Sequence, residues 1–255
     1  MDKYEINTYF ENQAISDEWD SLYDSKNPIS FPFIDRLNKT NLVLKSIKYS
    51  DILDLGCGTG IIIKHVIKKN NRYTGIDYSL NMINTIKYKY NNLINDYSIT
   101  LLNDDFDLME INKMYNLVIG LGFIEYSSNP DHTINKIYSK LDFDGSLILS
   151  FPNKLSLDYL MLKVLSILKV IIKIFLGKYP KQPPRTLWKT SDAIKILKNN
   201  GFRINSLHYY NTNILFYPIT RFFPKFCSAV ALKIESTPLN KLAMFSTGFI
   251  IHCQK

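Results

Sequence analysis

The chain has 255 residues, of which 46% are hydrophobic and 13% aromatic, so it can bury a large core and is not globally disordered. Its three cysteines, Cys57, Cys227 and Cys253, are far apart and stand in no metal-ligand spacing, which argues against a disulfide framework or a zinc site. The net charge is +8, and residues 151–200 carry all of it, with nine lysines and one arginine against two aspartates. This basic stretch favours contact with an anionic surface, and a solvated basic face explains it equally well.

The N-terminal part is polar and reads as helical and irregular over residues 1–48. It begins MDKYEINTYFENQ and contains no apolar signal core, so we expect a cytoplasmic protein. Two helical stretches are indicated, YFENQAISDEWDSLY at 9–23 and FPFIDRLNKTNLVLKSI at 31–47.

Strands and helices then alternate along the chain. Short apolar runs predict strands at 51–55, 72–76, 98–102, 115–121 and 145–151, and helical patterns lie between them at 60–70, 79–90 and 132–141. Repeated units of this length predict a parallel sheet with helices on both faces. The strands are continuous apolar runs, as expected when both faces of a sheet are covered.

The pattern changes after Pro152. Residues 154–189 form an insertion, and TSDAIKILKNNGF then predicts a helix with Thr190 or Ser191 as its cap and Gly201 as its stop. Strands are predicted at 202–210 and 246–255, while 211–246 contains no assignable pattern. No repeat or low-complexity linker is visible, so we expect one α/β domain over 49–255 with additions.

The stretch DILDLGCGTG, Asp51 to Gly60, places alternating glycines directly after a strand. Such a turn lets a ligand approach the main chain at the carboxyl edge of a sheet. The dinucleotide fingerprint GxGxxG fails because position 61 is isoleucine, and the phosphate loop fails because no GK[ST] follows.

Acids follow the next two strands at the same predicted edge. Asp77 ends the second strand 21 residues after Gly56, an offset at which an acid can accept both hydroxyls of a ribose. Asp104 and Asp105 end the third strand, where a carboxylate could meet the exocyclic amine of a purine. Any one of these acids could instead cap a helix. Acids at the ends of successive strands, on the same predicted edge as the glycine turn, favour a nucleoside pocket.

These motifs resemble those of the Rossmann-like, class I S-adenosylmethionine-dependent methyltransferases, nearest to the quinone-pathway and lipid-type enzymes. DLGCGTG is similar to the family's first motif, GIDYS to its second, NDDFDL to its third, YNLVIGLGFIEY to its fourth, and DFDGSLILSFPN to a segment around its fifth strand. The resemblance covers roughly residues 51–202 and implies a seven-stranded, mostly parallel sheet with helices on both faces.

The resemblance also implies a binding role for individual residues. Asp54, Gly56, Gly58 and Gly60 would line the methionine part of the cofactor, with Cys57 in the same loop as a small packing residue rather than a nucleophile. Asp77 would hold the ribose, with Tyr78 and Met82 flanking the ribose or adenine and Asp104 and Asp105 at the adenine edge. Gly120 and Leu121 would lie near the sulfonium.

The resemblance does not identify a catalytic base in this sequence. Quinone-pathway O-methyltransferases show an xExLEH-like run after the fourth strand, and the matching residues here are Gly122, Glu125 and Tyr126. Glu125 and Tyr126 stay candidates by position, and His132 follows as a weaker one; each also has a structural interpretation. Metal- or histidine-assisted chemistry therefore does not transfer directly, and no metal site is predicted.

Two additions to the domain invite interpretation. We interpret residues 1–48 as a helical lid, since water must be excluded from methyl transfer; ordinary packing of its aromatic residues is the alternative. In the insertion, Lys163, Ser166, Lys169 and Lys173 form one polar stripe on an otherwise apolar helix. That helix could cap the pocket, contact a membrane surface through residues 155–176, or pair with a second copy, but its internal lysines disfavour a transmembrane span.

Together these observations predict an S-adenosylmethionine-dependent methyltransferase that releases S-adenosylhomocysteine and acts on an oxygen of an amphipathic or lipid-linked small molecule. Alternatives are N- or C-methylation of a soluble metabolite, sugar or natural product, or a cofactor-binding partner subunit without activity. The segment GLGF stands where nucleic-acid amino-methyltransferases usually carry an Asn/Asp-Pro-Pro-Tyr/Phe run, which disfavours a nucleic-acid acceptor. A homodimer, and peripheral contact with the inner membrane face, are both compatible with the sequence.

Overall fold

The computed structural model describes most of the chain, namely residues 3–12, 18–24, 26–27, 29–157, 159–160, 185–212, 215, 219–235 and 238–255. Lys163, Ser166, Lys169 and Lys173 lie outside these residues, and so does most of the segment 155–176 for which a membrane contact is predicted. Among the described residues, no helix combines the length and the apolar character needed to cross a bilayer.

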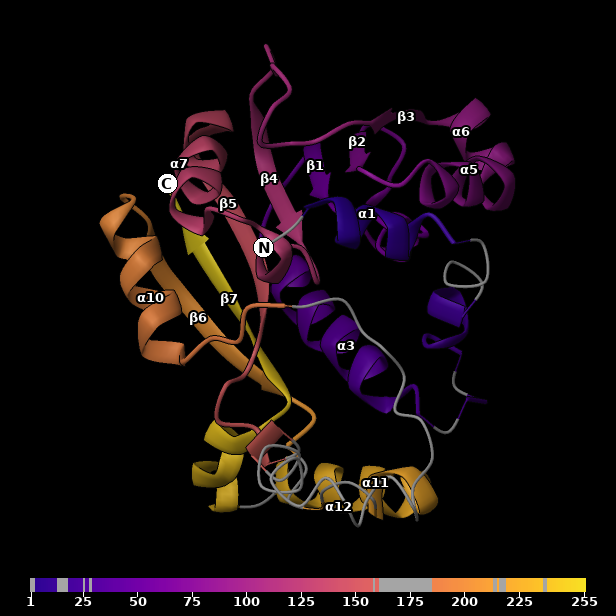
Figure 1. Ribbon diagram of the computed structural model, residues 1–255. Helices are drawn as coiled ribbons and strands as arrows, with labels where there is room; N and C mark the ends of the chain where they lie inside the picture. Colours follow the sequence, from indigo (N-terminus) through magenta and orange to yellow (C-terminus); the bar gives the residue numbers. More distant parts are fainter. Residues whose placement is uncertain are drawn as a thin grey trace.

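A seven-stranded sheet forms the centre of the protein (Figure 1). Its strands are β1 Asp51–Leu55, β2 Arg72–Asp77, β3 Ser98–Asn103, β4 Tyr115–Gly120, β5 Leu141–Pro152, β6 Arg203–Tyr210 and β7 Gly248–Gln254. The order is β3-β2-β1-β4-β5-β7-β6. Strands β1 to β5 pair in parallel, and β7 runs antiparallel to both β5 and β6. The predicted mostly parallel α/β sheet is thereby confirmed.

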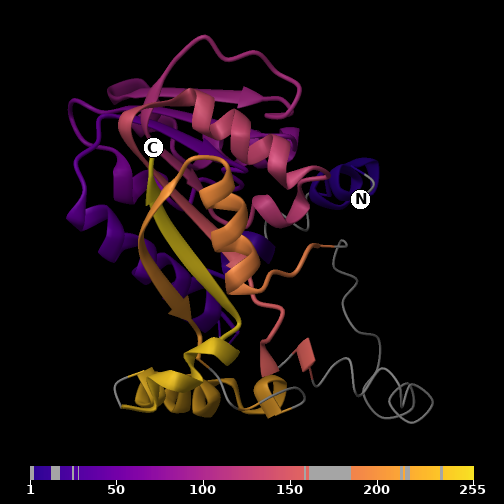
Figure 2. The ribbon, with the colours of Figure 1, turned by 90° about the vertical axis from the view of Figure 1, so that its left-hand side faces the viewer.

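Helices cover both faces of the sheet. The helices of the described residues, not all of which lie on the faces, are α1 Lys3–Phe10, α3 Phe31–Ser46, α4 Ile63–Val66, α5 Leu80–Lys89, α6 Asn91–Asp96, η1 Ile124–Tyr126, α7 Pro130–Lys140, α10 Thr190–Asn199, α11 Ile219–Phe222, α12 Pro224–Glu235 and η2 Pro238–Phe245. α7 and α10 pack on one face, where they lie side by side in Figures 1 and 2, and α3, α4 and α5 pack on the other.

The core explains why the strands read as continuous apolar runs. All five residues of β1 are buried. Leu53 and Leu55 join the apolar cluster beneath α7 and α10, whereas Ile52 joins the cluster beneath α3, α4 and α5. Successive side chains of a strand point to opposite faces, so a strand covered on both sides needs apolar residues at consecutive positions.

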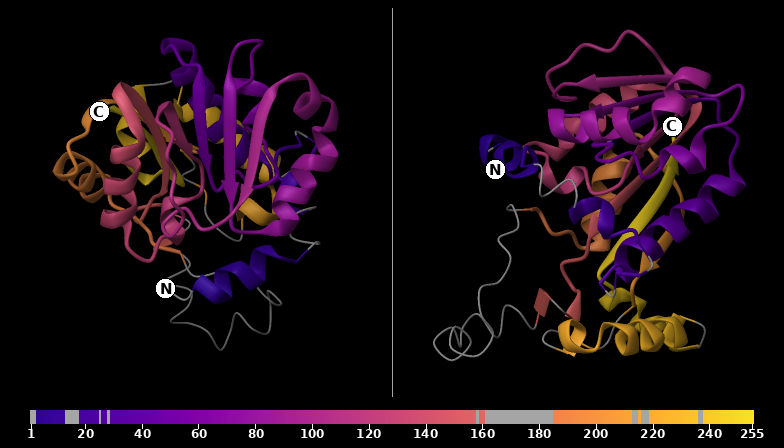
Figure 3. Two further views of the ribbon diagram at one scale, coloured as in Figure 1. Left: turned by 90° about the horizontal axis from the view of Figure 1, so that it is seen from above. Right: turned by 90° about the vertical axis from the view of Figure 1, so that its right-hand side faces the viewer.

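The parallel strands end at a common edge, and the N-terminal helix α1 lies beyond it (Figure 3, left). The loops after β1, β2, β3 and β4 meet at this edge because parallel strands share one carboxyl end. α11, α12 and η2 gather beyond the end of β6, at the bottom of Figure 1.

Three predicted helix boundaries were wrong. The helix expected at 9–23 does not continue through Glu11 and Asn12, because α1 spans Lys3–Phe10. The helix expected at 60–70 is only the short α4, because Gly60 and the turn after it belong to the loop, and the Asn71 side chain donates to the Val66 carbonyl 2.8 Å away at its end. Neither Thr190 nor Ser191 caps α10: the cap position is Lys189. The Thr190 hydroxyl lies 3.0 Å from the Tyr209 hydroxyl instead, so a tertiary contact replaces the local cap.

Candidate active site

The glycine turn after β1 forms the floor of a pocket. Gly56, Gly58 and Gly60 have φ values of 63°, 53° and 76°, a left-handed region that favours glycine. Gly56 and Gly58 line the pocket. A Cβ built on Gly58 would meet no other atom closer than 4.0 Å, so the space against this backbone is open to a ligand.

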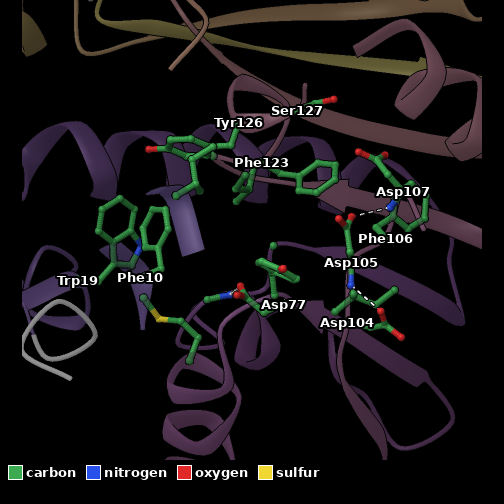
Figure 4. Close-up of a pocket in the computed structure, with 18 residues that line it drawn as sticks. Phe10, Trp19, Asp77, Asp104, Asp105, Phe106, Asp107, Phe123, Tyr126 and Ser127 are labelled. Atoms are coloured by element: carbon green, nitrogen blue, oxygen red, sulfur yellow. Dashed lines mark hydrogen bonds between the residues drawn. The ribbon is translucent and has the colours of Figure 1, made fainter. Parts of the chain in front are cut away.

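Asp77 ends β2 and lies in the middle of the same pocket (Figure 4). Its Oδ2 accepts a hydrogen bond from the Gly58 backbone N–H at 2.8 Å, and its Oδ1 accepts one from Ser79 at 2.9 Å. Burial raises the pKa of this carboxyl to about 6, against the lowering effect of those two N–H groups. Asp77 thus joins the glycine turn to α5 and presents a partly buried carboxylate to a ligand.

Four further predicted residues line the pocket beside Asp77: Tyr78, Met82, Asp104 and Asp105. Met82 is fully buried, and Tyr78 is half-exposed. The two acids form a turn in which the Asp105 N–H donates to Asp104 Oδ1 at 2.7 Å. They stand on the side of the pocket opposite Phe10 and Trp19 (Figure 4).

Four other predicted residues lie behind the lining rather than in it. Asp54 is buried and accepts a 2.6 Å hydrogen bond from the Tyr73 hydroxyl, and burial raises its pKa to about 7. Burial also raises the pKa of the Cys57 thiol, in keeping with a packing residue. A Cβ on Gly60 would collide with Ile63, and one on Gly120 with Leu149. These residues shape the loops that carry the pocket.

The N-terminal segment supplies an aromatic wall. Ile6, Phe10 and Trp19 line the pocket. The Phe10 ring makes edge contacts with Trp19 and with Tyr126, at centroid distances of 5.7 Å and 5.5 Å. Segments that are far apart in sequence therefore meet over the carboxyl edge, on the left of Figure 4.

The end of α1 is bonded to the start of α5. The Ser79 hydroxyl donates to the Phe10 carbonyl at 3.0 Å, and Glu11 Oε1 accepts the Leu80 backbone N–H at 2.7 Å. The Asn81 side chain donates to the Glu11 carbonyl. Because the first N–H groups of a helix lack partners within it, the Glu11 carboxylate acts as a cap supplied by another segment.

The segment after β4 forms the remaining side. Leu121, Gly122, Phe123, Tyr126 and Ser127 line the pocket. Glu125 is buried beneath it and outside the lining. His132 is exposed on α7, where its backbone N–H is capped by Asn129 at 3.3 Å. Of the three predicted catalytic candidates, the structure therefore brings only Tyr126 to the pocket wall.

Sequence reasoning did not name several lining residues, among them Ile6, Phe106, Asp107 and Phe123. The Phe106 and Phe123 rings lie edge to face at 6.1 Å. Both stand in motifs quoted from the sequence, NDDFDL and YNLVIGLGFIEY, so their place next to the acids and glycines was a usable signal. Ile6 carries no such signal, because only the folded position of α1 brings it there.

The pocket fits a nucleoside-bearing methyl donor. The space between its walls, including the part open to solvent, is about 930 Å³. It offers a bare glycine backbone, a partly buried carboxylate at Asp77, two acids at the far end and aromatic walls. Among the described residues, no group of three His, Cys, Asp or Glu side chains could hold a metal ion.

Comparison with known proteins agrees with this geometry. Residues 53–147 match the family model described as a methyltransferase domain. The chain is 28% identical over 152 residues to a malonyl-[acyl-carrier protein] O-methyltransferase of Priestia megaterium, covering 59% of this chain and 52% of that one. It is 27% identical over 183 residues to a ubiquinone biosynthesis O-methyltransferase of Rickettsia canadensis, covering 71% of this chain and 73% of that one. The chain thus spans about half the length of the first relative.

A solved structure shares the whole fold. The magnesium protoporphyrin IX methyltransferase of Synechocystis PCC 6803, with bound S-adenosylhomocysteine, superposes with a TM-score of 0.66 at 21% identity and covers 100% of both chains. The family match begins in β1 and ends in β5, and so spans the loops that build the pocket. Residues 53–147 are thus similar to a methyltransferase domain, and the chain shares the Rossmann-like fold of a methyltransferase solved with S-adenosylhomocysteine.

Proposed function

We propose that this protein transfers a methyl group from S-adenosylmethionine to an oxygen of a small-molecule acceptor and releases S-adenosylhomocysteine. One observation carries this proposal: Gly58, Asp77, Asp104 and Tyr126 line a single pocket. The names of both relatives, each an O-methyltransferase, support oxygen as the acceptor atom.

The cofactor would lie along the carboxyl edge, on the ends of β1, β2 and β3. Gly56 and Gly58 would contact its amino-acid tail, and Asp77 would accept the ribose hydroxyls. Asp104 and Asp105 would meet the adenine edge. The cofactor supplies a methyl group on a sulfonium. The protein therefore needs only to bind the two reactants, align them and exclude water from them.

The aromatic wall of Phe10, Trp19 and Tyr126 supports the proposed lid function of residues 1–48. Displacement of water strengthens electrostatic interactions in a site and prevents side reactions. Two hydrogen bonds hold this wall next to Asp77: the Ser79 hydroxyl donates to the Phe10 carbonyl, and the Leu80 N–H donates to the Glu11 carboxylate.

None of the three candidate bases is well suited to remove a proton from a hydroxyl acceptor. Burial raises the pKa of the Tyr126 hydroxyl far above neutral pH, so it holds its proton. Glu125 lies behind the wall, and His132 is outside the lining. A hydroxyl acceptor would therefore have to lose its proton by another route, whereas an acceptor already ionised at neutral pH needs no base.

Asp77→Ala tests the cofactor assignment, with the exposed Glu110→Ala as a control that also removes one carboxylate. We expect Asp77→Ala to weaken binding of S-adenosylhomocysteine by about tenfold or more in calorimetry, because partly buried acceptors are lost, and Glu110→Ala to bind normally. With labelled methyl donor and a cell extract, the wild type should transfer label to small molecules. Equal affinity of both variants would refute the assignment, and binding without any transfer would favour a partner subunit.

We further propose that the acceptor is amphipathic and that the protein contacts an anionic membrane surface. Besides the predicted insertion, a second part of the chain supports a membrane contact. Phe222, Phe223 and Phe226 on α11 and α12 are 63%, 63% and 61% exposed. Lys225 lies among them. Exposed aromatic residues next to basic ones are typical of surfaces that bind the interface of anionic bilayers.

A further inference from the structure

A second group of polar side chains is buried behind the pocket wall. Tyr23, Arg36, Glu125 and Tyr210, here called the Arg36 cluster, come from the N-terminal segment, α3, η1 and the end of β6. Arg36, Glu125 and Tyr210 are 7%, 5% and 6% exposed. The cofactor residues occupy the ends of β1 to β3, whereas this cluster lies between the ends of β4 and β6, on the half of the carboxyl edge left for an acceptor.

Arg36 is only partly satisfied within the protein. Its Nη2 donates to the Tyr23 hydroxyl, and its guanidinium lies 5.6 Å from the centroid of the Phe33 ring. Its Nε is buried and has no hydrogen-bond partner among the described residues. A buried, charged donor without a partner is unfavourable, so a ligand that supplies an acceptor here would be stabilised.

Glu125 does not neutralise Arg36. The two side chains interact electrostatically, but no ion pair within 4.0 Å joins them among the described residues, and Glu125 Oε2 is buried without a partner. Burial raises the pKa of this carboxyl, which favours its neutral form. A second cation, Arg185, also acts on Glu125 and Tyr126, so the region is positive overall.

Gly122 connects the cluster to the pocket. It lines the pocket with φ 78°. A Cβ built on it would lie 3.2 Å from Arg36 Nη1 and 3.8 Å from Glu125 Oε1. A side chain at Gly122 would press on the Arg36 guanidinium. Because Gly122 has none, the guanidinium lies directly behind the pocket lining.

We propose that Arg36 binds a carboxylate of the acceptor and that the protein forms a methyl ester, an inference that rests on the proposed methyl transfer. A guanidinium is planar and presents its N–H groups in a fixed fork that matches a carboxylate. In the reaction a carboxylate oxygen forms a bond to the methyl carbon while that carbon's bond to sulfur breaks and its electron pair stays on sulfur. No proton moves, which agrees with the lack of a suitable base among Glu125, Tyr126 and His132.

The bond formed distinguishes this proposal from other oxygen acceptors. Methyl esters release methanol in mild alkali, whereas methyl ethers and methylamines do not. The full chain is incubated with labelled methyl donor and the small-molecule fraction of a cell extract, and the products are then treated with alkali. We expect the label to become volatile. Label that is transferred but stable to alkali would overturn the ester and leave the proposed function standing, whereas cofactor binding without transfer would overturn both.

Variants of Arg36 test the binding residue. Arg36→Gln should lower the rate of alkali-labile methylation at limiting extract by about 100-fold and leave the affinity for S-adenosylhomocysteine within twofold, because a charge-assisted bidentate pair is lost. Arg36→Lys keeps the charge and should recover part of the rate. Arg72→Gln removes the same charge from a side chain that is 62% exposed and should behave as the wild type.

Two results would contradict a role of Arg36 in binding the acceptor. One is a methylation rate of Arg36→Gln within threefold of the wild type. The other is an equal loss of cofactor affinity and methylation together with a lower melting temperature, which would assign Arg36 to the structure alone. If Arg36→Gln does not fold, the alkali test on the wild type and the Arg36→Lys rate still decide the proposal.

Discussion

Two aspartates at strand positions near the pocket, the buried Asp54 and the partly buried Asp77, have different surroundings. Burial raises the pKa of both carboxyls, to about 7 and about 6. Asp77 lines the pocket, so a ligand's hydroxyls can compensate its burial. Asp54 lies behind the lining with the Tyr73 hydroxyl at 2.6 Å. No ligand can therefore compensate its ionisation, which lowers the stability of the folded state.

The raised pKa of Asp54 predicts how stability depends on pH. The folded state binds this proton more tightly than the unfolded chain, so the stabilisation is complete below pH 3.8 and is lost as the pH rises towards 7. Asp54→Asn cannot ionise and can still accept the Tyr73 hydrogen bond. Between pH 5 and pH 8, urea unfolding should show the wild type losing about 2 kcal/mol relative to Asp54→Asn. Parallel curves for the two proteins would contradict this prediction.

At the scale of elements, the contact between α1 and α5 is decisive for the pocket. α1 is only 8 residues long and would be marginal alone in water. Its end is held where the first turn of α5 offers backbone N–H groups, beside Ser79 and Asp77. The aromatic wall over the pocket thus depends on a helix-capping interaction made between segments.

Glu11→Ala should loosen this wall. The variant loses a carboxylate that caps and complements the N-terminus of α5, worth about 0.5–1 kcal/mol at a solvent-exposed position. We expect S-adenosylhomocysteine to dissociate about two to five times faster in stopped-flow measurements of Trp19 fluorescence, because that side chain lines the pocket. Glu11→Gln, which keeps a hydrogen-bond acceptor, should fall between. Unchanged dissociation in Glu11→Ala would show that this cap does not hold the wall.

At the scale of the whole molecule, the two ends of the carboxyl edge differ. α1 lies over the ends of β1 and β2, while α11 and α12 lie beyond β6 (Figure 1). The phenylalanines of α11 and α12 are exposed. Cys227 and Ala231 bury the opposite side of α12. α12 therefore has an inner apolar face packed on the protein and an outer one turned to solvent.

The exposed phenylalanines predict binding to anionic vesicles. The full chain should sediment with vesicles of phosphatidylglycerol and phosphatidylcholine and less so at high salt. Replacing Phe222, Phe223 and Phe226 with alanine should abolish sedimentation. A matched triple, Leu42, Tyr88 and Phe143 to alanine, removes exposed apolar groups from other elements and should sediment normally. Equal sedimentation of both triples, or none of the wild type, would exclude this surface.

Much of the fold could be predicted because its signals are local. β1 begins and ends as expected, and the other strands differ by a few residues at their ends, because apolar runs and turn residues specify strands directly. The early end of α4 is a local feature, since Asn71 bonds the Val66 carbonyl only five residues before it. The cap of α10 failed for another reason, because Thr190 bonds Tyr209, which comes from β6. Such contacts leave no mark in the local sequence.

The sequence by itself determined the sheet and the edge at which the glycines and acids meet, because these residues stand directly at strand ends and strand order alone brings them together. The tertiary structure alone decided which candidates face the pocket. It placed Tyr126 in the wall, Glu125 behind it and His132 outside, since side-chain direction after a strand depends on packing. It also brought Arg36 of α3 next to Gly122, at a separation of 86 residues in the chain, because α3 packs against β6 and β7, a contact that no local pattern encodes.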